Sequence, residues 1–332
     1  MAAKVITVLG ATGNQGGSVA RTFLTDQALA DWRVRAVTRD ASRPAAKKLK
    51  ELGAEIVLAD MNDVASLVAA MQGSYAIFAV TNYWEKADME YEIQQGKNLA
   101  DAAKAAKVKK YIWSSLYNIK ELTNGALPHV YHCDSKAIVE SYIRSLSIPA
   151  TFFYAGFYMS NISGIQSSPS EHAGAASFSN PEGLFKLTPD GRWVFSLPVS
   201  AKAVLPVYHT EDTGKYIKAA VLREEESLGG RILGATAYMT CEEIVEGFKR
   251  VFPKAGRSAE YRVQSEEEFR SELRAAGTPD YVIDEVYENM VLLEGKGLYG
   301  GDSLEWTHGL VVDHLTTWEE FARESKGFDG HE

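Results

Sequence analysis

The stretch Val5-Ile6-Thr7-Val8-Leu9-Gly10-Ala11-Thr12-Gly13-Asn14-Gln15-Gly16-Gly17 decides the fold. Its apolar half predicts a buried strand, and its three spaced glycines predict a sharp turn into a helix. Gly10 permits the turn, Gly13 lets the backbone approach a pyrophosphate, and Gly16 lets the helix pack close to the strand. Backbone N–H groups at a helix start favour such an anion. The turn residues expected to bind a dinucleotide are Gly10, Thr12, Gly13, Asn14, Gln15 and Gly16.

Short apolar runs alternate with amphipathic helical segments after this turn. The runs expected to form strands are Lys4–Leu9, Arg33–Thr38, Glu55–Ala59, Tyr75–Val80, Lys110–Ser115 and Ala150–Tyr154. Their nearly continuous apolar content is typical of strands buried on both faces of a parallel sheet. We therefore predict an α/β fold with a doubly wound, Rossmann-like parallel sheet.

The second half of the chain has a different character. Residues 163–203 are rich in Ser, Gly and Pro and predict loops with short strands. Helices should follow, with capping boxes at Thr240 and Glu243, Ser265 and Glu268, and Thr316 and Glu319, and with Pro279 as a first helical residue. We predict a Rossmann domain over residues 1–160. A smaller, mainly helical lobe should occupy residues 161–332, with some segments returning to the sheet.

Composition limits the function classes. The 332 residues carry a net charge of −9, which disfavours direct binding to nucleic acid. Two cysteines, Cys133 and Cys241, exclude a disulfide framework and indicate a reducing compartment. We find no membrane-length apolar run, no signal peptide and no metal-ligand spacing. We expect a cytoplasmic protein, with the nucleus as an alternative, and we leave a homodimer open.

The end of the second predicted strand indicates which dinucleotide binds. NAD-specific sites place an acidic residue near this point to bond the ribose 2′-hydroxyl. This chain has Thr38 and Arg39 instead, and an arginine can direct two N–H donors to a 2′-phosphate. The pattern therefore predicts NADP(H), with NAD as an alternative. Asp60 and Met61, after the third strand, are expected at the adenine.

The residues quoted above and several further strings together resemble the NmrA-like family, an atypical branch of the short-chain dehydrogenase/reductase fold. The strings are Gly10-Ala-Thr-Gly-Asn-Gln-Gly16, Val37-Thr-Arg39, Thr81-Asn-Tyr-Trp-Glu85, Gln95-Gly-Lys97, His132-x-x-x-Lys136, Phe157-Tyr-Met-Ser-Asn161 and Trp318-Glu-Glu-Phe321. The string from Thr81 makes the chain most similar to the NADPH-sensing members. The resemblance implies a dinucleotide at the carboxyl edge of the sheet and a small lobe closing a cleft.

Strand ends at that edge supply the other expected site residues, because α/β sheets bind ligands there. Further cofactor contacts are expected from Ala79, Val80, Thr81, Asn82, Tyr154, Gly156 and Phe157. A neighbouring substrate pocket is expected to be lined by Tyr83, Trp84, Tyr117, Tyr158 and Asn161.

One position governs the question of catalysis. Short-chain reductases use Tyr-x-x-x-Lys on one helix face, but here the residue four before Lys136 is His132. Lys136 can still bond the nicotinamide ribose. His132 can serve as a proton donor, or it can be a structural residue at a helix start. Ser114 and Ser115 occupy the place of the usual catalytic serine, or they cap a strand end or contact the ribose.

Two functions remain open from the sequence. The family resemblance and the altered Tyr-x-x-x-Lys pair favour an NADP(H) sensor that regulates a transcription-linked partner protein. The alternative is an NADPH-dependent reductase of a small carbonyl, quinone or enone that uses Lys136 and His132.

Overall fold

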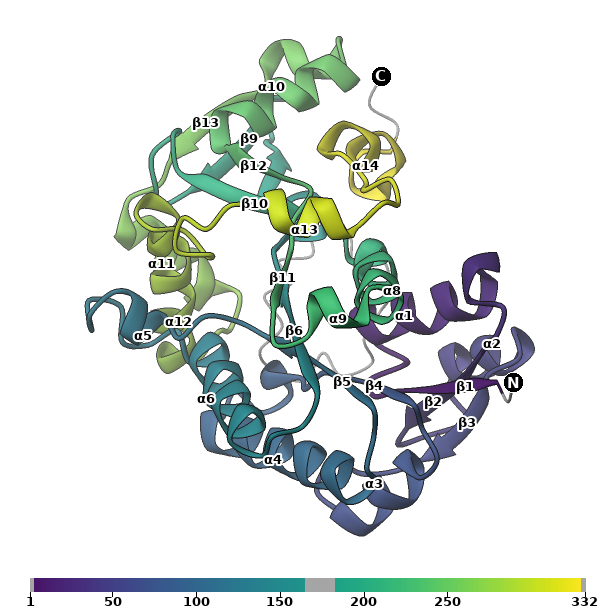
Figure 1. The fold of residues 1–332 in the computed structure, drawn as a ribbon. Coiled ribbons are helices and arrows are strands. Elements are labelled where there is room, and N and C mark those ends of the chain that lie inside the picture. Colours follow the sequence, from purple (N-terminus) through teal and green to yellow (C-terminus); the bar gives the residue numbers. More distant parts are fainter. Residues whose placement is uncertain (1–2, 165–182, 330–332) are drawn as a thin grey trace.

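A seven-stranded parallel sheet forms the centre of the computed structural model, which describes residues 3–164 and 183–329 (Figure 1). The strand order is β11-β6-β5-β4-β1-β2-β3. The strands are β1 (Lys4–Val8), β2 (Trp32–Thr38), β3 (Glu55–Leu58), β4 (Ala76–Ala79), β5 (Lys110–Ser115), β6 (Ala150–Ala155) and β11 (Arg231–Gly234). The chain winds outward from β1 to β3 and then crosses to β4 on the other side of β1. This reversal creates the crevice where such sheets bind ligands.

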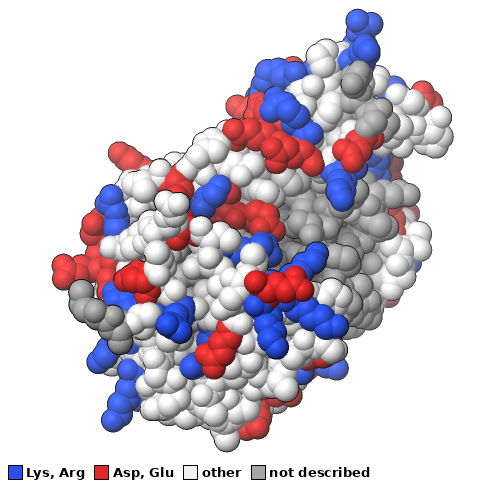
Figure 2. Space-filling model, turned by 90° about the vertical axis from the view of Figure 1, so that its right-hand side faces the viewer, with Lys and Arg blue, Asp and Glu red and all other residues white. Residues whose placement is uncertain are grey.

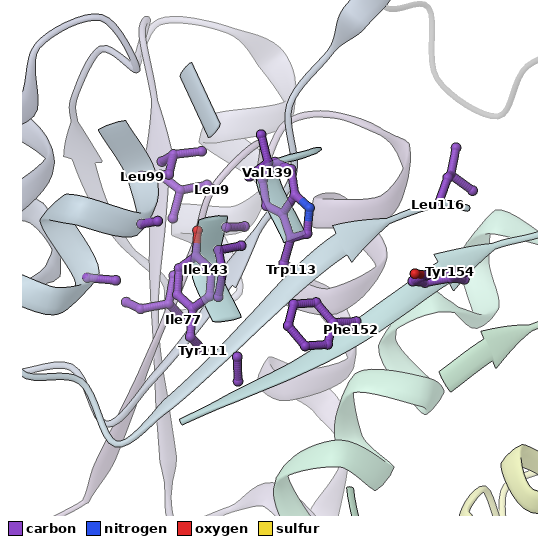
Figure 3. Close-up of a cluster of buried hydrophobic side chains, with 14 of the residues drawn as sticks. Leu9, Ile77, Leu99, Tyr111, Trp113, Leu116, Val139, Ile143, Phe152 and Tyr154 are labelled. Atoms are coloured by element: carbon purple, nitrogen blue, oxygen red, sulfur yellow. The ribbon is translucent and has the colours of Figure 1, made fainter. Parts of the chain in front are cut away.

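Helices cover both faces of the sheet, so the predicted doubly wound fold is confirmed. One face packs against α3 (Val64–Met71), α4 (Met89–Ala105) and α6 (Tyr131–Ser145), and the other against α1 (Asn14–Thr25), α2 (Pro44–Glu51) and α8 (Thr213–Leu222). Figure 3 shows Leu9, Ile77, Trp113, Val139 and Ile143 in the core between the first face and its helices. Burial of these apolar side chains fixes the layers.

The rest of the chain builds a second region with its own core. Two three-stranded sheets have the orders β12-β10-β7 and β13-β9-β8. Their strands are β7 (Phe157–Tyr158), β8 (Phe185–Leu187), β9 (Trp193–Leu197), β10 (Val204–Tyr208), β12 (Ala237–Thr240) and β13 (Glu260–Val263). The helices of this region are α7 (Met159–Ser163), α10 (Cys241–Val251), α11 (Glu266–Ala275), α12 (Asp280–Val291) and α14 (Trp318–Glu324). Three short helices, α5 (Ile119–Leu122), α9 (Glu224–Ser227) and α13 (Glu305–Leu310), pack instead against the large sheet and its helices. Residues 165–182 of the stretch predicted as loops lie outside the described residues.

Helix starts in this region test the predicted caps. The boxes at Thr240 and Ser265 are confirmed. The box at Thr316 is wrong, because α14 is capped one residue later by Thr317 with Glu320. Asp212 explains the shift, since it accepts hydrogen bonds from both the backbone N–H and the hydroxyl of Thr316.

One further helix start differs from the sequence prediction. Pro279 is the N-cap of α12 and not its first helical residue, because its backbone is extended, with ψ at 145°.

The surface carries mixed charge. Figure 2 shows acidic and basic side chains interspersed over one face of the molecule. No helix among the described residues combines the length and the apolar character needed to cross a membrane.

Candidate functional site

The turn between β1 and α1 is built as its glycine spacing predicts. Gly10 has a φ of +63°, in the left-handed region that favours glycine. A Cβ on Gly16 would lie 2.3 Å from the carbonyl oxygen of Gly10, so only glycine lets α1 pack this close to the strand end. These two glycines are therefore required by the fold itself.

Gly13 has a different role, because the fold does not require a glycine there. Its backbone is extended, and an added Cβ would approach no atom closer than the Gly10 oxygen at 3.4 Å. Gly13 caps α1 without a side-chain bond, which leaves the first backbone N–H groups of the helix to bind something else. Among the described residues, buried Oδ1 of Asn14 also has no hydrogen-bond partner. The turn thus fits a pyrophosphate, which would lie where the Gly13 side chain is missing.

Gln15, in the first turn of α1, links the ends of two strands, β5 and β7. Ser114, at the end of β5, donates a hydrogen bond of 2.8 Å to Oε1 of Gln15. Nε2 of Gln15 in turn donates to the hydroxyl oxygen of Tyr158, also at 2.8 Å. Burial raises the pKa of Tyr158, so its hydroxyl stays protonated. The Tyr158 proton is therefore available to an acceptor in the crevice.

The predicted adenosine side contains Arg39 at the end of β2. Nη1 of Arg39 lies 2.7 Å from Oε1 of Glu85, and Nη2 lies 3.1 Å from Oε2. Glu85 belongs to the single turn η2 (Tyr83–Glu85) that follows β4. Near them, the carboxylate of Asp60 accepts from Asn62, and Asp63 caps α3. The carbonyl of Met61, partly buried against the core, accepts from Asn98.

Lys136 lies in a buried polar cluster with Thr81, which follows β4, and Glu92 of α4. Its ammonium pairs with the carboxylate of Glu92 in α4 and lies 3.1 Å from the hydroxyl of Thr81. Glu92 also accepts from Thr81 and from Ser135. The side chain of Glu92 is only 2% exposed. The ion pair therefore neutralises a carboxylate that water cannot reach.

Removing this ammonium should destabilise the protein strongly. We expect Lys136→Met to lower the free energy of unfolding by about 3 to 5 kcal/mol, because Glu92 would be left buried and unpaired. Adding Glu92→Gln should restore much of the loss. Urea unfolding of the two single variants and the double variant measures the coupling. Additive losses would show that the two side chains do not stabilise each other.

His132 is engaged by the second region of the chain. Oε1 of Glu285 in α12 lies 2.7 Å from Nδ1 of His132 and accepts from its backbone N–H, while Oε2 accepts from the hydroxyl of Tyr83. Burial alone would lower the pKa of His132, but Cys133 and Glu285 outweigh it and raise the pKa to about 10. The ring of Trp84 lies 5.1 Å from the imidazole.

One turn further along α12, a second pair repeats this contact. Glu288 accepts from the backbone N–H of His129 and lies 2.5 Å from its Nδ1. His132 and His129 therefore connect the start of α6 to α12.

Other predicted contacts end strands at the same edge. Ala79 is buried at the end of β4, and Val80, Thr81 and Asn82 follow it. Gly156 is required by packing, because a Cβ there would lie 2.4 Å from the carbonyl oxygen of Pro206. The remaining turn and strand-end residues, Thr12, Phe157 and Asn161, are partly or fully buried near these segments.

Two of the aromatic residues predicted at the site have partners elsewhere in the fold. The Tyr154 side chain is buried in the core, where its hydroxyl donates to Glu140. Tyr117 packs edge-on against Tyr154 and donates to Asp302. It lines a separate pocket of about 270 Å³, with Arg231, Leu233, Asp302, Ser303, Trp306 and Thr307.

Three acidic residues were not predicted from the sequence. Glu85 stands in the string from Thr81, but nothing local indicates that it reaches Arg39. Glu92 lies in the first turn of α4, where no feature of the local sequence distinguishes it. Glu285 could have been found from the sequence, because an acidic residue among Val282, Ile283 and Val286 on the apolar face of a helix indicates a buried carboxylate that needs a partner.

A family model, a curated relative and solved structures each match most of this chain. A model described as NmrA-like family matches residues 2–322. An NmrA-like family domain-containing oxidoreductase, hkm9, from Aspergillus hancockii is 31% identical over 262 residues, which cover 76% of this chain and 74% of that protein.

Two solved structures superimpose on nearly the whole chain. NmrA, a negative transcriptional regulator solved with NADP, has a TM-score of 0.76 and 25% identity, covering 98% of this chain and 95% of its own. An NADPH-dependent quinone oxidoreductase from Escherichia coli, solved with NADPH, has a TM-score of 0.70 and 22% identity, covering 95% and 97%.

Proposed function

The chain belongs to the NmrA-like family, and from this premise we propose that it binds NADP(H) and acts as a dinucleotide sensor that regulates a partner protein. The Gly10–Gly16 turn would hold the pyrophosphate, and Arg39 would face the adenosine ribose. Support comes from the missing side chain at Gly13, the unpartnered Oδ1 of Asn14 and the NADP complex of NmrA. When bound, the nicotinamide supplies hydride chemistry.

The main support for the sensing role is that both candidate catalytic side chains already have carboxylate partners within the protein. Lys136 is paired with Glu92, and His132 is bound to Glu285. A general acid works best with a pKa near the working pH, whereas the pKa of His132 is raised to about 10. Both groups thus serve better as internal contacts than as proton donors at neutral pH.

Residues 81–85, here named the linking turn, supply a route from the nucleotide to the second region. Thr81 contacts Lys136 and Glu92, and Tyr83 bonds Glu285 of α12. Glu85, at the other end, binds Arg39. A nucleotide that moved the linking turn would therefore alter the contact with α12, provided that it binds the two arrangements with different affinity.

The regulated partner is proposed to be a protein and not DNA. A net charge of −9 disfavours a phosphate backbone, so a transcription-linked role would act through a protein in the cytoplasm or the nucleus. The likeness to NmrA, a negative transcriptional regulator, supports this choice.

Hydrogen–deuterium exchange with and without NADPH tests the sensing role. We expect NADPH to change exchange in residues 81–85 and in α12, because Tyr83 and Glu285 connect them. Helix α13 serves as an internal control, because it packs against β11, the edge strand of the large sheet. Unchanged exchange in α12 at saturating NADPH would remove the sensing role while leaving nucleotide binding intact.

An NADPH-dependent reductase of a small carbonyl, quinone or enone is the second candidate. The hydrogen bonds from Ser114 through Gln15 to Tyr158 favour it, because the protonated Tyr158 hydroxyl can donate a hydrogen bond that orients and polarises a substrate oxygen. The curated relative is likewise named an oxidoreductase. Single-turnover oxidation of bound NADPH across a carbonyl and quinone panel separates the candidates. A substrate-dependent rate would favour the reductase, and its absence across the panel would favour the sensor.

A further inference from the structure

The guanidinium of Arg39, which is expected to bind the adenosine ribose, already forms an ion pair with Glu85. Both oxygens of Glu85 face the two terminal nitrogens of Arg39, at 2.7 and 3.1 Å. The side chains are 45% and 22% exposed, so a ligand can reach the pair. The guanidinium that would bind a 2′-phosphate thus already has an anionic partner within the protein.

The position of the pair follows from the sheet order. Arg39 follows β2 and Glu85 follows β4, and β1 lies between these strands. The two side chains therefore meet across the carboxyl end of β1, beside the Gly10–Gly16 turn. A dinucleotide lying along that turn would meet this ion pair.

A second acid reduces the positive potential further. The hydrogen bonds of Glu85 raise the pKa of Arg39, and the charges of Glu85 and Asp60 add to this effect. Two carboxylates thus act on one guanidinium.

We infer that Glu85 competes with the 2′-phosphate for Arg39 and thereby sets the preference between NADP(H) and NAD(H). The inference rests on the proposed function, because it concerns the same nucleotide site. A 2′-phosphate either displaces Glu85 from the terminal nitrogens or binds Arg39 beside its carboxylate. If the phosphate displaces Glu85, the two hydrogen bonds of the ion pair are lost. If it binds beside Glu85, two negative charges lie close together. In both cases Glu85 weakens phosphate binding. NAD(H) lacks the phosphate and leaves the pair intact.

Glu85→Gln tests the inference by removing one charge at nearly constant size. We expect the variant to bind NADPH and 2′,5′-ADP roughly 3- to 10-fold more tightly, as a partly exposed ion pair allows. NADH and 5′-AMP should change less than about twofold, because they carry no 2′-phosphate. Calorimetric titration of all four ligands measures these constants.

A matched control is available on the same sheet. Glu55 pairs with Arg35 at 2.9 Å, and it begins β3 at the opposite, amino edge. Glu55→Gln changes the net charge by the same amount, and we expect it to leave all four affinities unchanged.

The outcomes distinguish a failure of the inference on Glu85 from a failure of the proposed function. A Glu85→Gln protein that binds NADPH no more tightly, or that tightens NADPH and NADH equally, would overturn the inference alone. If the unmodified chain bound neither NADPH nor NADH, the proposed function itself would fail.

Discussion

Replacing Gly13 with alanine is expected to weaken NADPH binding about 100-fold while leaving the fold intact. The affinity loss follows because a Cβ would occupy the space where the pyrophosphate meets the N–H groups of α1, and hydrogen bonds to charged groups are strong. The fold should tolerate the change, since Gly13 has extended backbone and no neighbour within 3.4 Å of the added atom. Only the weaker capping by alanine, about 1 kcal/mol, should lower stability.

Gly16→Ala is the matched control, with the opposite expectation for stability. Its Cβ would lie 2.3 Å from the Gly10 oxygen, which is a backbone atom, and the position of the Cβ is itself fixed by the backbone, so neither can rotate away. We expect a loss of about 3 kcal/mol or more in the free energy of unfolding, as overpacking gives at its upper end. Urea unfolding and nucleotide titration of both variants measure the contrast. A Gly13→Ala protein with unchanged NADPH affinity would show that the turn does not bind the pyrophosphate.

The contrast between these glycines shows what a local sequence pattern can predict. The phosphate turn depends on neighbours in the chain, so spacing alone indicated it. The first six strands of the large sheet were likewise predicted, because each is a nearly continuous apolar run. The seventh, β11, was not identified, since Arg231-Ile-Leu-Gly234 offers only two apolar side chains, and its place is fixed by pairing with β6.

Pairings between distant residues were not predictable in the same way. Lys136 meets Glu92 across 44 residues, and His132 meets Glu285 across 153. Each partner stands on a helix whose position depends on how whole layers pack. The sequence therefore indicated that Lys136 and His132 matter but not which residues engage them.

The Thr38–Arg39 end of the second strand illustrates the same point for specificity. The NADP(H) prediction considered only residues next to Arg39 in the chain. In the fold, Glu85 arrives from beyond β4, because β1 brings the ends of β2 and β4 together. A specificity rule based on one strand end therefore omits acids that the neighbouring strand supplies.

We expect Glu285 to contribute more than any other residue of α12 to the packing of this helix against α6 and the linking turn. It is fully buried and accepts from the backbone and ring of His132 and from Tyr83. We expect Glu285→Gln to lower the free energy of unfolding by about 3 kcal/mol or more, because it breaks a buried ion pair. Exchange in α12 should rise at the same time, since these contacts connect it to α6.

The pH dependence of this effect follows from His132. Its pKa in the folded chain is raised to about 10 from an ordinary value of 6.5. The folded state thus retains the proton more strongly, and the stabilisation is fully present below pH 6.5 and is lost as the pH rises toward 10. His132→Gln should therefore destabilise the protein most near pH 6 and progressively less toward pH 10.

Urea unfolding of His132→Gln across this pH range provides the measurement, with His314→Gln as control. His314 pairs with Glu320 at the surface, where its side chain is 69% exposed, so its loss should change stability by less than about 0.5 kcal/mol. If the His132→Gln difference stayed constant from pH 6 to 10, the pKa of His132 would not be raised in the folded protein. His132 would then regain a pKa suited to proton transfer, and the balance between sensor and reductase would move toward the reductase.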